Sequence, residues 1–155
     1  MNFSEKLKKA SVDAGISLNE KQLEQFEKFY HLLIEKNKVM NLTSITEEDE
    51  VIEKHFIDSL TCRRVMDMDS VKSLIDIGTG AGFPGIPLKI VYPEISVVLL
   101  DSLNKRVKFL QEVIRDLGLT GVEAVHGRAE DLARKPEYRG CLLYTSPSPR
   151  DSTSS

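Results

Sequence analysis

The stretch "DIGTGAGFPGIP", from Asp76 to Pro87, is the feature that most constrains the fold. It places four glycines and two prolines in twelve residues, directly after the apolar run "VKSLIDI". Glycine adopts backbone conformations with positive φ and lets a ligand approach the main chain closely. A buried strand followed by such a turn predicts a ligand-binding loop. The alternative is a purely structural turn between a strand and a helix.

From residue 69 onward, short apolar runs alternate with stretches of helical pattern. Strands are predicted over residues 71–78, 95–101 and 122–127, and helices over 86–93 and 104–119. This order is typical of a doubly wound α/β sheet, of which residues 69–140 would supply the first half. Right-handed crossovers bring the loops after the strands to the carboxyl edge of the sheet, where open α/β sheets bind ligands.

Residues 1–68 are predicted to form an extension of three helices in front of this sheet. Apolar residues recur at helical spacing on one face of each helix. Expected at these inward positions are Phe3, Leu7 and Ala10, then Leu23, Phe26, Tyr30, Leu33 and Ile34, then Val51, Ile52, His55, Phe56, Ser59 and Leu60. Ser17 or Asn19 is expected to cap the second helix, and a capping box of Thr46 and Asp49 the third.

The glycine-rich stretch fits two ligand-binding motifs in different registers. Gly80-x-Gly82-x-x-Gly85 matches the dinucleotide fingerprint. The other register, Asp76-x-Gly78-x-Gly80-x-Gly82, matches the motif of S-adenosylmethionine-dependent methyltransferases. Both motifs place glycines where the chain turns tightly and a ligand approaches the backbone.

The residues around the stretch favour the methyl donor over a dinucleotide. In either reading, Asp101 at the end of the second strand would bind ribose hydroxyls. A dinucleotide also places its pyrophosphate on the helix N-terminus, where Pro84 removes one N–H donor. The acid Asp76 would repel that pyrophosphate but suits the ammonium and sulfonium groups of S-adenosylmethionine. An NAD-dependent oxidoreductase fragment and a non-catalytic cofactor-binding fragment remain the alternatives.

Further motifs occur along the chain in a fixed order. They are "NKVMNLTSI", "KHFIDSL", "DIGTGAGFPGIPLKI", "LLDSLNKRVKFLQEV" and "GRAEDL". With these motifs the chain resembles the bacterial 16S rRNA (guanine-N7) methyltransferase family, also called the glucose-inhibited division protein B family, over residues 1 to about 140. The resemblance implies a Rossmann-like methyltransferase domain behind an N-terminal helical extension. It also implies S-adenosyl-L-methionine as methyl donor and N7 of a guanine in 16S rRNA as acceptor.

The resemblance also implies positions for the cofactor. Gly78 and Phe83 in the first loop would bind it, beside the Gly80 of the methyltransferase motif. Ala129 and Glu130, after the third strand, would lie next to the adenine. Asp101 matches the ribose-binding acid of the wider methyltransferase class. A later arginine segment of the family is absent, so no arginine contact to the cofactor is assigned.

The expected chemistry requires no proton transfer. Guanine N7 carries an in-plane lone pair and no proton, so its attack on a methyl group needs no general base. Catalysis then rests on in-line positioning and on the electrostatics of the site. We therefore predict no catalytic proton-transfer residue and no metal site. An unstacked base in an rRNA loop is the expected form of the substrate.

Outside the cofactor loops, His55 and Asp58 of "KHFIDSL" have two interpretations. They either border the cleft and help to place the base, or belong to the core and the solvated face of a helix. Basic side chains that could contact phosphates, or simply face solvent, are Arg63, Arg64, Lys105, Arg106 and Lys108.

The last fifteen residues read as foreign sequence. The segment Cys141–Asp151 matches a translation of a transposase adapter used to build sequencing libraries. We therefore expect natural sequence to stop near Gly140, the gene product to be cut short, and residues 141–155 to show no stable packing on the domain. The apolar "CLLY" could nevertheless pair with a sheet edge left open by the truncation. Processing scars of this kind are excluded from fold reasoning.

Composition bounds the location and partners only loosely. The chain has two cysteines, no signal-peptide pattern, no apolar run long enough to span a bilayer, and a net charge of −3. We expect a cytoplasmic protein without a membrane partner, which is monomeric when full length. The small net charge neither supports nor excludes binding to nucleic acid.

Overall fold

Four parallel strands form the centre of the structure, a computed structural model that describes residues 1–64, 67–132, 135–136 and 141–145. They are β1 (Ser73–Ile77), β2 (Ser96–Asp101), β3 (Val122–His126) and β4 (Leu142–Thr145). The strand order is β3-β2-β1-β4, and every neighbouring pair runs parallel. The first three strands and the α/β class are as predicted.

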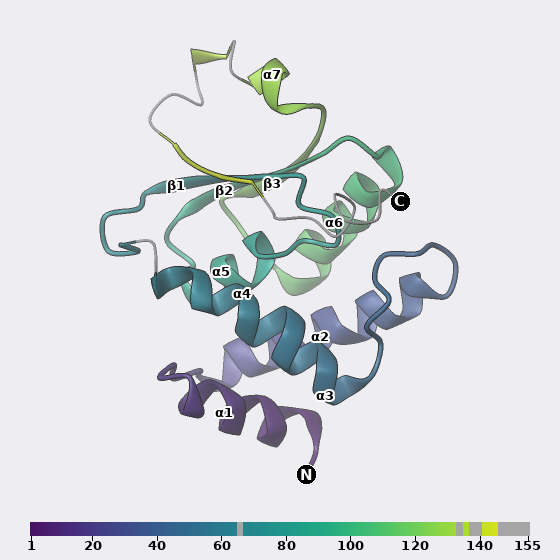
Figure 1. Cartoon of the computed structure of the whole chain (residues 1–155), viewed down its shortest axis with the longest axis vertical. Coiled ribbons are helices and arrows are strands. Elements are labelled where there is room, and N and C mark those ends of the chain that lie inside the picture. Colours follow the sequence, from purple (N-terminus) through teal and green to yellow (C-terminus); the bar gives the residue numbers. More distant parts are fainter. Residues whose placement is uncertain (65–66, 133–134, 137–140, 146–155) are drawn as a thin grey trace.

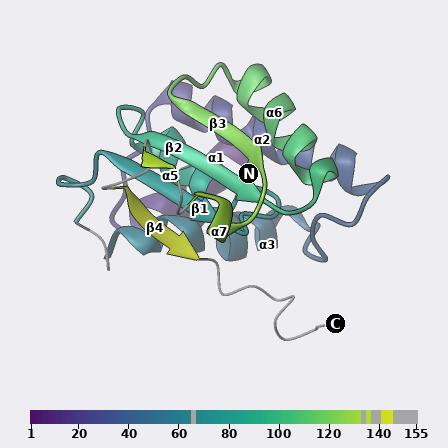
Figure 2. The same cartoon turned by 90° about the horizontal axis from the view of Figure 1, so that it is seen from above.

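The strand β4 corrects the prediction that residues 141–155 show no stable packing, and it pairs at the open sheet edge for which "CLLY" was the expected exception. Figure 2 shows it at the edge of the sheet beside β1, where Leu74 pairs with Leu142 and Ile77 with Thr145. Without it, the inner strand β1 would present unpaired backbone groups, which any short apolar segment can satisfy. Leu142 packs on the core, whereas Leu143 is 61% exposed. Residues 146–155 lie outside the described part of the chain.

The two faces of the sheet meet different elements. The helices α5 (Gly85–Val91) and α6 (Asn104–Leu117) lie on the same side as the N-terminal helices, and α7 (Ala129–Leu132) lies on the other (Figure 1). Side chains alternate along each strand. Leu74, Val97 and Leu99 therefore join the main core, while Ile75, Val98 and Leu100 cluster with Leu132 of α7.

The N-terminal extension is helical, as predicted. Its first helices, α1 (Phe3–Asp13) and α2 (Glu20–Asn37), each begin with a capping box, in which Asn2 and Asn19 accept a backbone N–H. The third helical run consists of α3 (Glu48–Glu50), the π-helix η1 (Val51–Ile57), α4 (Asp58–Leu60) and the 3-10 helix η2 (Thr61–Arg64).

The predicted capping box of the third helix is wrong. Glu47 is the N-cap, and it makes no side-chain capping bond. Asp49 instead pairs with Lys6 of α1, with the two charged groups 2.9 Å apart. Glu48 pairs with the same ammonium at 2.9 Å. The start of this run is thus held by a contact between helices, which local spacing does not reveal.

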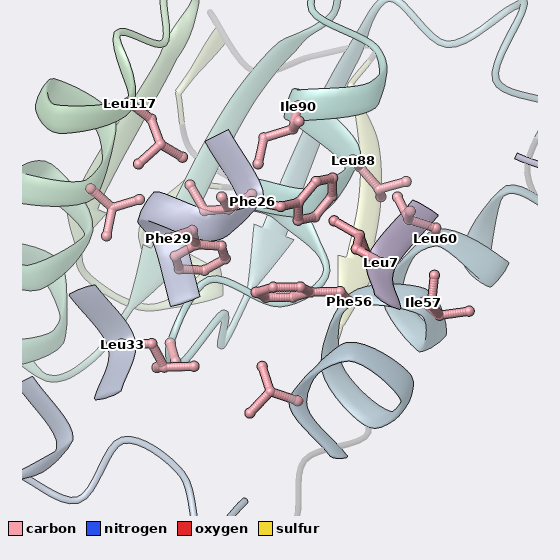
Figure 3. Packing of buried hydrophobic residues seen from close by; sticks show 14 of the residues in the cluster. Leu7, Phe26, Phe29, Leu33, Phe56, Ile57, Leu60, Leu88, Ile90 and Leu117 are labelled. Carbon is pink, nitrogen blue, oxygen red and sulfur yellow. The ribbon is translucent and has the colours of Figure 1, made fainter. Parts of the chain in front are cut away.

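Aromatic side chains join the helical extension to the sheet. Phe26 and Phe29 of α2 point toward Phe56 of η1, with ring centroids 5.0 and 5.5 Å apart (Figure 3). Phe29 was missing from the predicted face, whereas Tyr30, which was included, is only half-buried. One hydrophobic core runs from Phe3 to Leu117. It crosses the boundary expected at residue 68 without interruption.

The close packing of α5 on the sheet predicts that Gly85→Ala destabilises the protein. A Cβ at Gly85 would clash with Leu99 and approach the Asp76 carboxylate to 2.9 Å. Because neither neighbour is free to move, we expect a loss of about 1–3 kcal/mol in urea unfolding. The control is Gly127→Ala, where the added atom meets its neighbours at 3.5 Å and should be tolerated. Equal stability of the two variants would contradict this packing argument.

Candidate functional site

Three loops meet at the carboxyl edge of the sheet. They follow β1, β2 and β3, and they carry the glycine-rich stretch, residues 102–103 and residues 127–128. Backbone bonds join them: Gly78 and Thr79 donate to Leu100 O, and Gly127 donates to Asp101 O. This is the edge at which parallel α/β sheets bind ligands.

The carboxylate of Asp101 links the first loop to the second. Its side chain is 3% exposed, and its Oδ2 accepts the Gly80 N–H at 2.8 Å. Its Oδ1 accepts the Leu103 N–H at 2.9 Å and faces the Arg106 guanidinium at 3.5 Å. A buried carboxylate requires such donors. The predicted ribose-binding acid therefore also holds the glycine-rich loop in place.

Asp76 closes the same loop from inside. It is fully buried, and its Oδ2 accepts the Thr79 hydroxyl at 2.7 Å and the Gly85 N–H at 2.9 Å. These bonds join the end of β1 to the start of α5. The sequence suggested that Asp76 faces the cationic end of a ligand. In this structure Asp76 has no exposed surface, and its hydrogen bonds hold the loop in its conformation.

The N-terminus of α5 has no free donor in its first turn. The Gly85 N–H is bonded to Asp76, and the Ile86 N–H is bonded to Gly82 O at 2.8 Å. Pro84 and Pro87 carry no N–H at all. A pyrophosphate needs such donors at a helix N-terminus. This arrangement disfavours the dinucleotide register of the motif.

The glycines of the first loop leave its backbone uncovered. Gly78 and Gly80 have φ of +70° and +63°, and no atom lies within 4 Å of a Cβ built at either position. Residues that carry a Cβ rarely adopt this left-handed backbone conformation. The loop thus presents bare main chain beside Asp101, which is what close contact with a ligand requires.

Phe83 of the same loop packs on the helical extension. Its ring lies parallel to His55 of η1, with centroids 4.4 Å apart and an interplanar angle of 9°. Phe29 and Phe56 lie at 5.5 and 6.1 Å. These contacts show that its side chain has core neighbours, an alternative that the sequence left open.

A polar contact at the edge of the ring also holds His55. Its Nε2 lies 2.7 Å from the Thr43 hydroxyl, in the "NLTSI" stretch. Burial lowers the pKa of His55 from its ordinary value, and the charge of Asp58 opposes this by raising it. Asp58 itself is exposed. Of this pair, only the histidine is in contact with the candidate cofactor loop.

Comparisons with known proteins identify the family. The family model GidB, described as rRNA small subunit methyltransferase G, matches residues 22–143. The chain belongs to this family. The match covers the glycine-rich loop, His55 and Asp101, and it ends two residues into β4.

Several relatives carry the family's name. The chain is 58% identical over 125 residues to ribosomal RNA small subunit methyltransferase G of Lachnoclostridium phytofermentans, covering 81% of this chain and 52% of the relative. It is 56% identical over 133 residues to the Desulforamulus reducens protein of the same name, covering 86% and 55%. The chain thus spans about half the length of these relatives.

A solved structure shows a weaker likeness. The N-terminal domain of human METTL16 in complex with SAH aligns with a TM-score of 0.48 and 17% sequence identity. The alignment covers 85% of this chain and 55% of that one.

The remaining positions that family resemblance suggested lie beside the third loop. Ala129 and Glu130 begin α7 directly after β3, and both are exposed. They occupy the expected place in the fold, at the same sheet edge as Asp101.

The basic residues divide into two groups. Arg63 donates to Ala14 O and Gly15 O at the end of α1, and Arg106 faces Asp101, so both have structural partners. Lys105 and Lys108 are exposed on α6. The side chain of Arg64 lies outside the described part of the structure.

Within the described residues, no group of three or more His, Cys, Asp or Glu side chains could hold a metal ion. None of the described helices is both long enough and apolar enough to cross a membrane.

The lowered pKa of His55 predicts a pH-dependent contribution to stability. The fold favours neutral His55, whereas the unfolded chain takes up the proton below about pH 6.5. The contribution is therefore complete above about pH 6.5 and is lost as pH falls below it. As pH falls from about 7.5 to 5.5, the unfolding free energy of the wild type should fall relative to that of His55→Phe in urea titrations.

Thr43→Val is the control for this experiment. It removes the hydroxyl partner but retains the titrating ring, so its pH dependence should follow that of the wild type. If the unfolding free energies of wild type and His55→Phe changed equally with pH, burial of the ring would not control its protonation.

Proposed function

We propose that the carboxyl edge of this sheet binds S-adenosyl-L-methionine and that the natural protein transfers its methyl group to N7 of a guanine in 16S rRNA. The proposal rests chiefly on the Asp101 carboxylate, which holds the bare glycine loop at the end of β2. Family membership and the names of the relatives support it.

Six residues are proposed to bind the cofactor. Gly78 and Gly80 would contact it with uncovered backbone, and Asp101 would accept hydrogen bonds from its ribose. A carboxylate has about four lone-pair positions. The Gly80 and Leu103 amides occupy two of them, and the Arg106 guanidinium faces Oδ1. Phe83 would border the site, and Ala129 and Glu130 would lie beside the adenine.

The transfer itself is a single displacement. The N7 lone pair forms a bond to the methyl carbon as the carbon–sulfur bond breaks, and the sulfonium becomes a neutral thioether. No proton moves to the protein, so no general base is assigned. The site acts by aligning the two reactants and by excluding water. The guanine must leave its stack to reach the crevice, which favours a loop of the rRNA.

The small ribosomal subunit or its RNA precursor is the proposed partner, and Lys105 and Lys108 are candidate phosphate contacts. A cytoplasmic location and a monomeric full-length protein complete the proposal. The origin of residues 141–155 as adapter-encoded sequence also stays a proposal. Reading the genomic DNA beyond the codon for Gly140 tests it directly.

Cofactor binding is tested with a matched pair of glycine variants. Gly80 and Gly118 share left-handed φ and open surroundings, but Gly118 follows α6 at the opposite edge of the sheet. Valine should strain both positions equally, while only Gly80→Val blocks a ligand at the carboxyl edge. We expect calorimetry to show at least about tenfold weaker binding of S-adenosylhomocysteine for Gly80→Val alone, or roughly 1.4 kcal/mol.

A second pair examines the acid. Asp101→Ala should weaken binding by a similar amount, and Asp13→Ala, on the exposed end of α1, should not. Unchanged affinity in both Gly80→Val and Asp101→Ala would refute the site. Tight binding of NAD in place of S-adenosylhomocysteine would favour the oxidoreductase alternative.

Activity is measured with labelled S-adenosylmethionine and undermethylated small-subunit RNA. A full-length relative should label guanine N7. The 155-residue chain, which spans about half of that length, is expected to transfer methyl groups far more slowly. A comparable rate for the two proteins would show that the additional half of the relatives is dispensable for catalysis.

A further inference from the structure

The cofactor loop is supported by the helical extension through one parallel ring pair. His55 and Phe83 lie 28 positions apart in the sequence, yet their rings are stacked, with centroids 4.4 Å apart and planes only 9° from parallel. The other aromatic neighbours of Phe83, Phe29 and Phe56, are farther away and tilted by 36° and 45°. Of these three rings, His55 is the nearest to Phe83 and the most nearly parallel to it.

The ring of His55 is in turn fixed by a chain of hydrogen bonds from α2. Asn37 Oδ1 accepts the N–H groups of Leu42 and Thr43, at 2.7 and 3.0 Å. The Thr43 hydroxyl accepts the Ile45 N–H at 3.0 Å and lies 2.7 Å from His55 Nε2. An imidazole with one fixed nitrogen and one stacked face has little rotational freedom.

Backbone hydrogen bonds connect Phe83 to the turn that contains Gly80. Its own N–H and that of Gly82 both bond to Thr79 O, at 3.2 and 3.0 Å. The same turn contains Gly80, whose N–H is bonded to Asp101. Displacement of Phe83 would move the turn and lengthen the bond between Gly80 and Asp101.

We propose that His55 is a positioning residue for the cofactor loop, holding Phe83, and through it the turn around Gly80, in the geometry that binds the methyl donor. The relevance to a methyl donor rests on the proposed function. The effect on the loop does not, because it concerns contacts within the free protein. The "NLTSI" stretch thereby acquires a role as the support of His55, although it lies outside the cofactor loops.

The first measurement is amide hydrogen exchange of the free 155-residue chain, followed by NMR. His55→Ala should accelerate exchange of the Gly80 N–H by about two- to tenfold, which corresponds to the loss of one aromatic pair. His55→Phe retains a ring on Phe83 and should restore slow exchange. Thr43→Val likewise keeps the ring and loses the polar contact, so its exchange rate should match that of His55→Phe.

Leu7→Ala is the control for general loss of stability. Leu7 is a buried residue of α1, the helix that lies farthest from the sheet in Figure 1, and its truncation leaves both rings of the His55–Phe83 pair in place. Exchange of Gly80 in each variant is compared with that of core amides in β2. The proposal requires that His55→Ala accelerates amide exchange at Gly80 but not in the core of β2. Leu7→Ala should accelerate exchange at Gly80 and in β2 by a similar factor.

The second measurement is the affinity for S-adenosylhomocysteine by calorimetry. His55→Ala should weaken binding by a factor similar to its exchange effect, and His55→Phe should bind like the wild type. Unchanged Gly80 exchange in His55→Ala, or no recovery in His55→Phe, would overturn the inference. Failure of the wild type to bind the ligand would count against the proposed function of this chain, while the exchange data would still decide the role of His55.

Discussion

The Asp101 carboxylate is the constraint on which the candidate site depends. Asp101 is only 3% exposed, so its carboxylate needs hydrogen-bond donors from the protein in place of water. The backbone amides of two different loops supply them, at Gly80 and Leu103. The carbonyl of the same residue accepts the Gly127 N–H of the third loop. One residue at the end of β2 thus sets the relative positions of all three loops that surround the proposed crevice.

The glycine loop has a second support, which comes from outside the sheet. Phe83 inserts among Phe29, His55 and Phe56, which belong to helices that precede β1 in the sequence. The extension is therefore part of the architecture of the site. A continuous core across residue 68 is consistent with this role. Two separately packed units could shift relative to each other and would not hold Phe83 in a fixed position.

The class of the fold and the order of its elements were predictable, because apolar residues recur at different spacings in strands and in helices. The position of the ligand-binding loops was predictable because they follow the carboxyl ends of parallel strands. The predictions failed where contacts between distant segments decide the outcome. Lys6 replaces the local capping box at Asp49, and the open edge of β1 pairs with residues 142–145, a pairing that the apolar "CLLY" allowed but did not require. The positions of Gly78, Gly80 and Asp101 followed from spacing, but the support from His55 did not.

The sequence by itself determined the parallel α/β order, the glycine loop after β1 and the acid after β2, because each is encoded within a few consecutive residues. Only the tertiary structure decided that Asp76 serves the loop from inside, that α5 offers no donor to a pyrophosphate, and that Phe83 rests on His55. These contacts join residues up to 28 positions apart. Their geometry arises from packing of the helical extension on the sheet, which no local pattern records.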